Sequence, residues 1–436
     1  MSFQSSFGLV PLGDVVHFIN GDRSTNYPKG DDYVDDGTPF ISAADLSEGR
    51  IDYSSVRRIT SSAYERLRSG KIQRDDVLFC LRGSIGKIAY VKEREVGAIA
   101  SSLVIVRATG KIDPRYLFFG LGSQAGQQAA IGLNNGAAQP NLSVGELQKI
   151  HLPVPPLPIQ RRIAGILSAY DELIENSQRR IRILESMARA LYREWFVHFR
   201  FPGHESAPRI PSPLGEIPQG WEVIPFDHLL ESMTGGDWGS EQSEGRDTAE
   251  VIVVRGTDFD EVAYGGQLRA PVRYIKPSSL VSRGLKVGDV IIENSINAKS
   301  RSVGTTLLVD GHVLNRLNHD AIAASFCKVF RPHDRRISPL VHLHARHLRE
   351  DARMEYYQNV AANGIANFQA QKFAKEENLG LPTDQELRAK LINPISAIFQ
   401  SVGVLASQLS NLRRTRDLLL PRLLSGQIDV EALDHA

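Results

Sequence analysis

The second half of this chain repeats the first half, and this repeat constrains the fold more than any other feature of the 436 residues. The stretch FGLVPLGDVVHFINGD near the start resembles WEVIPFDHLLESMTGGD just past the midpoint. Further along, Asp76 matches Asp289 at a separation of 213 residues, and Arg107 matches Arg331 at a separation of 224. Because the separation only grows along the chain, the pattern indicates a duplication with a few loop insertions.

Each half begins with short apolar runs and ends with a long helical pattern. The runs at 77–79, 103–106 and 290–291 have the length and composition of strands, and the glycine and asparagine residues between them indicate turns. We therefore predict an α+β fold. It would contain two globular domains of mixed helices and strands in a pseudo-two-fold repeat, separated by two long antiparallel coiled-coil helices.

Two long apolar stripes define the predicted helices, one from about 159 to 199 and one from about 384 to 424. Apolar residues recur at alternating steps of three and four, with one extra four-residue step in the first stripe, as in a coiled-coil seam with a stutter. A single stripe would favour ordinary core packing, but two similar stripes favour pairing with each other. The residues assigned to this seam or to partner contacts are Ile163, Ile166, Tyr170, Leu173, Ile181, Leu184, Leu191, Trp195, Leu391, Ile398, Val402, Leu405, Leu409 and Leu412.

Four large aromatic residues, Trp195, Phe196, Phe199 and Phe201, close the first stripe. We expect them to end the helix against a domain or a partner surface. A segment rich in proline and glycine follows, which is typical of a linker. The predicted boundaries are 1–155 for the first domain, 156–200 for the central helix, 201–220 for the linker, 221–382 for the second domain and 383–436 for the C-terminal helix.

Composition restricts the surroundings in which the chain can work. The net charge is +1, so any surface that binds nucleic acid must be local rather than spread over the whole chain. Two cysteines cannot form a disulfide framework, which indicates a reducing compartment. The first residues lack the basic and apolar regions of a secretory signal, and we find no apolar run long enough to cross a bilayer. We expect a cytoplasmic protein with no membrane partner.

Motifs that carry catalysis are missing from the sequence. It contains no GxxxxGK[ST] phosphate-binding loop and no GxSxG nucleophile turn. His342, His344 and His347 could form a metal site, but the matching positions of the first half carry no ligand, so we expect no metal. Cys80 adjoins an apolar run and is expected to be a small core residue rather than a nucleophile.

Polar turns at matched positions of the two halves are the candidate binding surface. Surface turns are polar in most proteins, so each turn alone is a weak signal. Arginine, lysine, asparagine and glutamine are also the side chains that recognise base edges in the major groove of DNA, and their recurrence in both halves favours this role. The candidate DNA-binding residues are Arg23, Arg82, Ser84, Lys87, Asn135, Gln139, Asn141, Arg255, Asn297, Lys299, Arg301, Asn363 and Asn367.

Three stretches resemble the conserved regions of a known family. LPVPPLPIQRRIAGILSAYDELIENSQRRI and LYREWFVHFRFPGHE resemble the central conserved region of the specificity subunits of type I restriction–modification enzymes. LRRTRDLLLPRLLSGQIDV resembles their C-terminal conserved region, and the repeat matches their architecture over nearly the whole chain. The second helix departs from the pattern, because it lacks the Pro-Pro-x-x-x-Gln spacing that Pro155, Pro156 and Gln160 show in the first.

The resemblance implies a DNA-recognition subunit without catalytic activity of its own. Each globular target-recognition domain would recognise one half of a bipartite double-stranded DNA target. The helices would set the spacing and dock methyltransferase subunits, two in number, on which restriction subunits with motor activity would assemble. The resemblance implies no cofactor in this chain and places S-adenosylmethionine, ATP and Mg²⁺ in the partner subunits.

Two other functions remain open at the level of the sequence. The near-zero net charge is compatible with a coiled-coil scaffold that assembles proteins and no longer recognises DNA, whose complex would bind DNA without a salt dependence or not at all. The chain could also be an enzyme in its own right, although the missing motifs argue against it. Modification of DNA by the purified chain alone would identify an enzyme.

Overall fold

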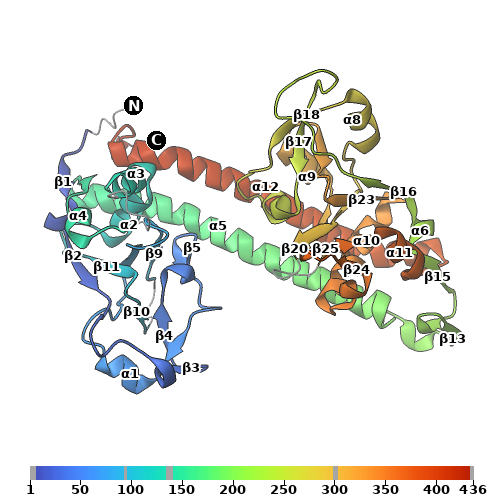
Figure 1. Cartoon of the computed structure of the whole chain (residues 1–436), viewed down its shortest axis with the longest axis horizontal. Helices are drawn as coiled ribbons and strands as arrows, with labels where there is room; N and C mark the ends of the chain where they lie inside the picture. Colours follow the sequence, from blue (N-terminus) through green and yellow to red (C-terminus); the bar gives the residue numbers. More distant parts are fainter. Residues whose placement is uncertain (1–5, 93–95, 134–140, 298–302, 433–436) are drawn as a thin grey trace. The chain divides into compact units, whose positions relative to one another are not determined.

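The computed structural model describes residues 6–92, 96–133, 141–297 and 303–432 (Figure 1). The chain divides into two compact units: unit 1 contains 1–172 and 413–436, and unit 2 contains 173–412. Each unit contains sheets, short helices and a part of both long helices. The predicted α+β class with two repeated mixed domains is therefore confirmed.

An antiparallel four-stranded sheet lies at the centre of unit 1. Its strand order is β2 (Val16–Asn20), β11 (Leu103–Ala108), β8 (Val77–Cys80) and β9 (Ile88–Tyr90). On one face, Val77 and Phe79 pack with Tyr116 of α2 (Pro114–Gly122). On the other face, Leu78 packs with Ile41 of a second sheet. Both faces of β8 are thus buried, which explains why its sequence is an unbroken apolar run.

Unit 2 repeats this sheet strand for strand. The order is β16 (Leu230–Gly235), β23 (Cys327–Pro332), β19 (Val290–Glu293) and β21 (Thr306–Leu308). A parallel pair also recurs: β4 (Thr38–Ile41) with β10 (Ala98–Ile99) in unit 1, and β17 (Ala249–Val254) with β22 (Ala321–Ala323) in unit 2. The duplication inferred from the sequence is confirmed by this shared topology.

The remaining elements complete each unit around its central sheet. Unit 1 adds β1 (Leu9–Pro11) paired with β12 (His151–Pro153), β3 (Tyr33–Val34), β5 (Leu46–Ser47), β6 (Arg50–Ile51), β7 (Arg58–Ile59), α1 (Ser61–Arg66), α3 (Gln124–Gly132) and α4 (Val144–Leu147). Unit 2 adds β13 (Arg209–Ser212) paired with β14 (Gly215–Pro218), β15 (Trp221–Pro225) paired with β26 (Asn378–Pro382), β18 (Val272–Ile275), β20 (Ser295–Asn297), β24 (Gln358–Val360) and β25 (Ile365–Phe368). Its short helices are α6 (Phe226–Leu229), α7 (Phe259–Tyr264), α8 (Pro277–Arg283), α9 (Gly311–Leu317), α10 (Ser338–Glu350) and α11 (Ala370–Glu376).

A buried ion pair occupies the same place in both central sheets. Arg107 donates from Nε and Nη2 to the two carboxylate oxygens of Asp76, at 2.7 and 2.8 Å. Arg331 does the same to Asp289, at 2.7 Å for both bonds. Both aspartate side chains are only 1% exposed. The four residues that identified the repeat in the sequence are therefore partners in one framework contact, made once in each unit.

The two long helices are α5 (Leu157–Tyr192) and α12 (Gln385–Ser425), close to the predicted ranges. Gly426, with φ of +73°, ends α12 in the left-handed conformation that favours glycine. Seam residues Ile163 and Ile166 join the core of unit 1, whereas Leu191, Trp195, Leu391 and Ile398 join the core of unit 2. A separate cluster between the helices, within unit 2, contains Ile174, Ile181, Leu184, Val402, Leu405, Ala406, Leu409 and Leu412.

The predicted seam is off by one position just before the stutter of the first stripe. Leu173 was assigned to the seam but is 53% exposed, and the adjacent Ile174 is buried against the second helix instead. Tyr170 is half-buried and belongs to neither the core of its unit nor the helix–helix cluster. Both residues are apolar and adjacent, so the sequence does not distinguish which one faces the second helix. Only the packing of the two helices shows it.

The aromatic residues after α5 belong to the core of unit 2. A single π-helical turn at Arg193–Val197 ends the helix. Phe196, Phe199 and Phe201 surround Trp221, with ring centroids 5.9, 5.2 and 5.2 Å from it. The expectation that these rings end the helix against a domain is confirmed. The segment after them contains the β13–β14 hairpin rather than an irregular linker alone.

The second helix lacks the Pro-Pro-x-x-x-Gln pattern, and a different contact replaces that of the glutamine. In the first helix, the buried Gln160 donates from its amide to the carbonyl of Pro155 at 2.7 Å. In the second, Arg388 donates from Nε to the carbonyl of Pro382 at 2.8 Å and from Nη2 to Glu222 at 2.9 Å. A longer side chain thus ties the start of the second helix to the strand before it.

By length and composition alone, α12 could cross a membrane, because its most apolar stretch has a mean hydropathy of 1.3. The sequence prediction that no apolar run is long enough is wrong by this criterion. Part of the apolar surface of α12 packs inside the protein, with Leu391 and Ile395 in the core of unit 2 and Leu405 and Leu409 against the first helix. The contacts of these residues with the core and with the first helix explain why α12 is apolar.

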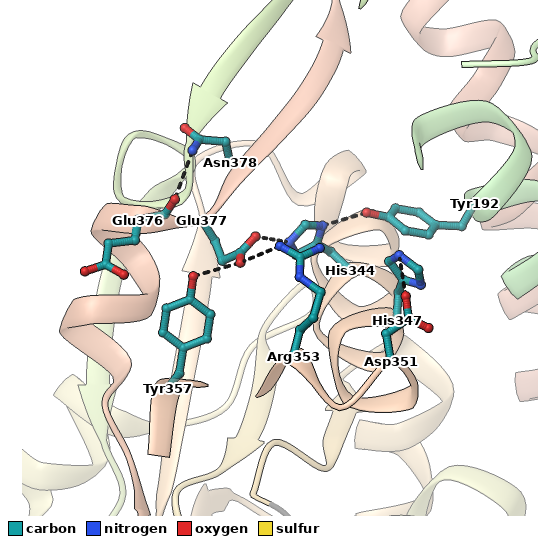
Figure 2. A network of polar contacts seen from close by, with 9 residues as sticks. All are labelled: Tyr192, His344, His347, Asp351, Arg353, Tyr357, Glu376, Glu377 and Asn378. Atoms are coloured by element: carbon teal, nitrogen blue, oxygen red, sulfur yellow. Dashed lines mark hydrogen bonds and ion pairs between the residues drawn. The ribbon is translucent and has the colours of Figure 1, made fainter. Parts of the chain in front are cut away.

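A buried polar network connects the end of α5 to the body of unit 2 (Figure 2). The hydroxyl of Tyr192 lies 2.7 Å from Nδ1 of His344, and Nε2 of that ring lies 3.1 Å from Oε2 of Glu377. The other oxygen, Oε1, accepts from Tyr357 at 2.8 Å and from Arg353 at 3.2 Å. Burial raises the pKa of the Glu377 carboxyl, but the bonds from His344 and Tyr357 and the nearby charges outweigh it and leave this pKa below its ordinary value of 4.5.

Loss of the repeated ion pair is expected to destabilise each unit to a similar extent. Asp76→Ala and Asp289→Ala each leave a partly buried guanidinium without its partner, which costs about 3–5 kcal/mol. Chemical denaturation of the two variants measures this loss. Lys390→Ala, which removes an exposed i,i+4 pair with Glu386, is the control and is expected to change nothing measurable. An equally small effect of the aspartate variants would contradict the assignment.

Glu377→Gln is expected to weaken the protein at neutral pH and to matter less in acid. At pH 7 the variant loses charge-assisted hydrogen bonds worth roughly 1.5–3 kcal/mol. Because the folded-state pKa is lowered, the stabilisation is present above pH 4.5 and disappears as the pH falls through the folded value. Thermal unfolding at pH 7 and pH 4 should therefore show a gap between wild type and variant that narrows in acid. The adjacent exposed Glu376→Gln is the control, and a pH-independent gap would refute the role of Glu377.

Candidate nucleic-acid interface

Five of the predicted DNA-binding residues of unit 1 gather at one end of its central sheet. The strands are antiparallel, so the ends of β2 and β8 lie beside the beginnings of β11 and β9. Arg23 follows β2, and the turn between β8 and β9 carries Arg82, Ser84 and Lys87, all exposed. Asn141 pairs with this turn. Sheet geometry therefore assembles a surface from residues that are far apart in the sequence.

Backbone pairing holds these side chains in place. Arg82 and Asn141 form an antiparallel bridge, and the Nε of Arg82 donates to the Asn141 carboxamide oxygen at 3.2 Å. The amide of Leu142 donates to the carbonyl of Leu81 at 2.9 Å. Arg23 donates from Nη2 to the carbonyl of Ser101, just before β11, at 3.1 Å. The surface is thus supported by the sheet rather than by a free loop.

The charge of this end of the sheet is locally positive. Within the described part of the chain, neither Arg23 nor Arg82 forms an ion pair with a carboxylate. The neighbouring Asp22 is occupied elsewhere: its oxygens accept from Ser24 and from the amide of Arg68, and hydrogen bonds from Ser24 hold the pKa of this carboxyl below its ordinary value. Two guanidinium groups are consequently available to a phosphate or a base edge.

The same construction recurs in unit 2. Ser295 pairs with Asn367, and the Ser295 hydroxyl donates to the Asn367 carboxamide oxygen at 2.6 Å. The amide of Phe368 donates to the carbonyl of Asn294 at 2.7 Å, as Leu142 does to its partner in unit 1. Asn367 therefore occupies the place that Asn141 occupies in the first repeat. The sequence comparison suggested both asparagines but did not pair them with each other.

Two further asparagines belong to this region, one in a turn and one on a strand. Asn363 is exposed in the turn between β24 and β25, where its side-chain oxygen accepts from the amide of Ile365 at 3.1 Å. The backbone of Asn297 in β20 lies opposite Ile365. The candidates Asn135, Gln139, Lys299 and Arg301 fall outside the described residues.

Arg255 has a framework contact in this structure. Its Nε and Nη2 donate to both carboxylate oxygens of Asp258, at 2.8 and 2.7 Å, and this bonding raises the pKa of the guanidinium. In unit 1, the matched Ser42 donates to the matched Asp45, at 2.7 Å from both the amide and the hydroxyl. The shared geometry assigns Arg255 a structural contact, and its role in DNA binding stays a prediction.

Sequence analysis did not select two aromatic residues of unit 2 at the same end of the sheet. Trp238 follows β16 and Phe326 precedes β23, with ring centroids 5.7 Å apart. Phe326 is 37% exposed. The signal that could have found Trp238 is the match of NGDR with GGDW, which places Arg23 of unit 1 over it, and the match of SSLVIVR with ASFCKVFR places Ser102 over Phe326.

The histidines considered as metal ligands have other partners. His344 belongs to the buried network, and His347 lies 3.5 Å from Asp351 one turn along α10. His342 bonds to Thr306 at 2.9 Å, and burial lowers the pKa of its ring to about 3. Across the described residues, no group of three or more His, Cys, Asp or Glu side chains could hold a metal ion.

Comparison with known proteins identifies relatives of this chain. Residues 5–186 match the type I restriction modification DNA specificity domain. The specificity subunit of the type I restriction enzyme MjaIX of Methanocaldococcus jannaschii is 27% identical over 216 residues, which are 49% of this chain and 50% of that protein. The corresponding subunit of the EcoBI enzyme of Escherichia coli is 27% identical over 172 residues, 36% of this chain and 35% of that protein. The chain thus spans at most about half the length of these curated relatives.

A solved structure has the same fold over almost the whole length. The S subunit of a type I restriction-modification system from M. genitalium superposes with a TM-score of 0.55 at 14% identity, covering 97% of this chain and 98% of that chain. The resemblance stated from the sequence is therefore confirmed: residues 5–186 match the specificity domain of type I restriction–modification enzymes, and nearly the whole chain has the fold of a solved S subunit.

Proposed function

We propose that this chain is the DNA-recognition subunit of a type I restriction–modification complex, in which each unit recognises one half of a bipartite target. The observation that carries the proposal is the recurrence of one surface in both units. Each surface lies at the same end of an equivalent sheet and presents an asparagine held by a side-chain hydrogen bond, Asn141 or Asn367. Asparagine can recognise adenine through a bidentate contact, and the guanidinium groups of Arg23 and Arg82, which form no ion pair within the described residues, suit phosphate or guanine.

We further propose that the chain has no catalytic activity and binds no cofactor. The two cysteines are poor nucleophiles, because burial raises the pKa of the Cys80 thiol and raises that of Cys327 to about 12. Methylation and cleavage would belong to partner subunits that bind S-adenosylmethionine, ATP and Mg²⁺. The complex would work in the cytoplasm, where its double-stranded DNA target lies.

The long helices would dock two methyltransferase subunits, with restriction subunits assembling on those, and would set the spacing between half-sites. The helices contain 36 and 41 residues, and a straight helix rises ~1.5 Å per residue. Beside the helix–helix cluster of unit 2, a groove is lined by Ile183 and Val404, and both are about half-exposed. Exposed apolar residues beside a buried seam are a feature of protein-docking surfaces.

A methylome tests the recognition function directly. The chain is expressed with its neighbouring methyltransferase subunit in a methylation-free host, and modified adenines are mapped by single-molecule sequencing. Two short specific sequences around a fixed unspecified gap are expected, and exchange of residues 221–382 should alter one of them only. An assembled complex that modifies nothing, or binds DNA without a salt dependence, would favour a scaffold instead.

Substitutions confined to one unit should affect one half-site only. Asn141→Ala with Arg82→Ala is expected to weaken binding through the first half-site, and Asn367→Ala through the second, each by about tenfold since a lost base contact costs ~1–3 kcal/mol. Competition between duplexes mutated in either half-site measures the effect. Lys390→Ala, far from these surfaces in the sequence and exposed on α12, is the control. An equal loss of affinity at both half-sites would contradict the assignment of one half-site to each unit.

Substitutions at two adjacent residues of α12 test the seam and the docking groove independently. Leu405→Asp buries a charge in the helix–helix cluster and should destabilise the chain by several kcal/mol, most strongly together with Leu184→Asp. Val404→Asp places the same charge on the exposed side and should leave unfolding unchanged while weakening methyltransferase binding. Thermal unfolding and co-purification measure the two effects. Methyltransferase binding unaffected by Val404→Asp would exclude this groove.

A further inference from the structure

We propose that Trp238 and Phe326 recognise a thymine in the second half-site through its methyl group. The inference rests on the proposed function and deepens it, because it names the base and the kind of contact. It begins from a difference between two surfaces that are otherwise equivalent. Where unit 1 presents polar side chains, unit 2 presents an aromatic pair.

The structural equivalence of the positions is well defined. An added Cβ on Gly21 would meet the carbonyls of Ile99 and Ala100, and one on Gly236 would meet those of Ala323 and Ala324. The chain after each glycine therefore passes the same point of the sheet. Two residues later, unit 1 has Arg23 and unit 2 has Trp238.

The second aromatic residue, Phe326, also has an equivalent position in unit 1. Phe326 precedes β23 as Ser102 precedes β11, and the registers of Leu103 on Cys80 and of Cys327 on Glu293 align the two positions. A serine suffices at this place in unit 1, so the fold does not require a large apolar residue there. Phe326 is nevertheless a phenylalanine with 37% of its surface exposed. Together with Trp238 it forms an aromatic pair that the fold does not require and that offers an apolar contact surface to a ligand.

The aromatic pair is held rigidly. Arg273 lies over the Trp238 ring, 5.4 Å from its centroid, and is itself tied to Glu241 at 3.2 Å. Trp238 also packs against the apolar core around β17. The carbonyl of Phe326 accepts from the amides of Asn294 and Ser295, at 2.8 and 3.3 Å. A contact surface that is already ordered loses little conformational entropy when it binds.

The pair adjoins the proposed base-recognition residue of unit 2. Ser295, whose amide bonds to Phe326, donates its hydroxyl to Asn367. In the major groove, adenine offers the donor and acceptor that an asparagine recognises, and thymine offers a methyl group that only an apolar surface recognises. An asparagine beside an aromatic pair is therefore suited to a half-site that contains A·T pairs.

The arrangement favours a lateral contact over insertion between bases. A ring that inserts between two base steps has a base against each of its faces. One face of Trp238 is covered by Arg273, and the ring is tilted by 38° against Phe326. Insertion would break these contacts, whereas a methyl group can pack on the exposed edge of the pair without disturbing them.

The test uses the assembled complex and duplexes that contain the motif identified by its methylome. Each thymine of the second half-site is replaced in turn by deoxyuridine, which removes the methyl group and nothing else. At one position, affinity should fall by about fourfold, the equivalent of ~0.8 kcal/mol for one buried methyl-sized group. Trp238→Ala with Phe326→Ala should bind thymine and deoxyuridine duplexes equally at that position. Phe326→Leu, which keeps an apolar surface, should retain part of the preference.

The outcomes separate this inference from the function on which it rests. If the wild-type complex binds its motif but tolerates deoxyuridine at every position of the second half-site, the methyl contact is refuted and DNA recognition stands. If the double variant retains the full preference for thymine, another residue makes the contact. If the assembled wild-type complex fails to bind the motif at all, both proposals fail. Deoxyuridine in the first half-site is the internal control, and its effect should be the same for wild type and the double variant.

Discussion

The structure depends on a buried carboxylate paired with a partly buried guanidinium at the start of one central strand of each sheet. The pairs Asp76–Arg107 and Asp289–Arg331 tie the turn that enters one central strand to the neighbouring strand. Each aspartate also accepts from a backbone amide three residues earlier, Gln73 or Lys286, so the charge is bonded on several sides. A buried charge with its bonds satisfied is tolerated, whereas the same charge without them is strongly unfavourable. The pair therefore fixes the two strands whose ends carry the proposed binding surface.

Much of this architecture could be predicted from the sequence, because the duplication repeats the same apolar and polar pattern in both halves. Strands buried on both faces gave unbroken apolar runs, and the helices gave long periodic stripes. What failed was local. Leu173 and Ile174 are both apolar, so which of them is buried depends on how the second helix packs against them. Arg255 looked like a surface cation, although Asp258 three residues later offered it a partner. The equivalence of Asn141 and Asn367 needed the strand pairing, since insertions had shifted their separation.

Stability and the proposed recognition of DNA are assigned to different residues in both units. The ion pairs and sheet cores lie inside, whereas Arg23 and Trp238 stand at equivalent points beyond the strand ends. A basic side chain and an aromatic one can occupy this place without any change in strand order. The chemistry of the contact can thus differ between the two halves while the framework stays the same. This separation is the physical reason why a near-neutral chain can still present a local surface suited to nucleic acid.

The bridge between Arg82 and Asn141 has a consequence for folding. Its two residues are 59 positions apart in the chain, and Ser295 and Asn367 are 72 apart. Contacts between such distant residues form late and slowly, because the intervening chain must first be ordered. A nascent or partly unfolded chain consequently has the basic side chains but not the surface that arranges them. Each proposed surface is complete only when its unit is folded, so a selective contact with a base requires the folded unit.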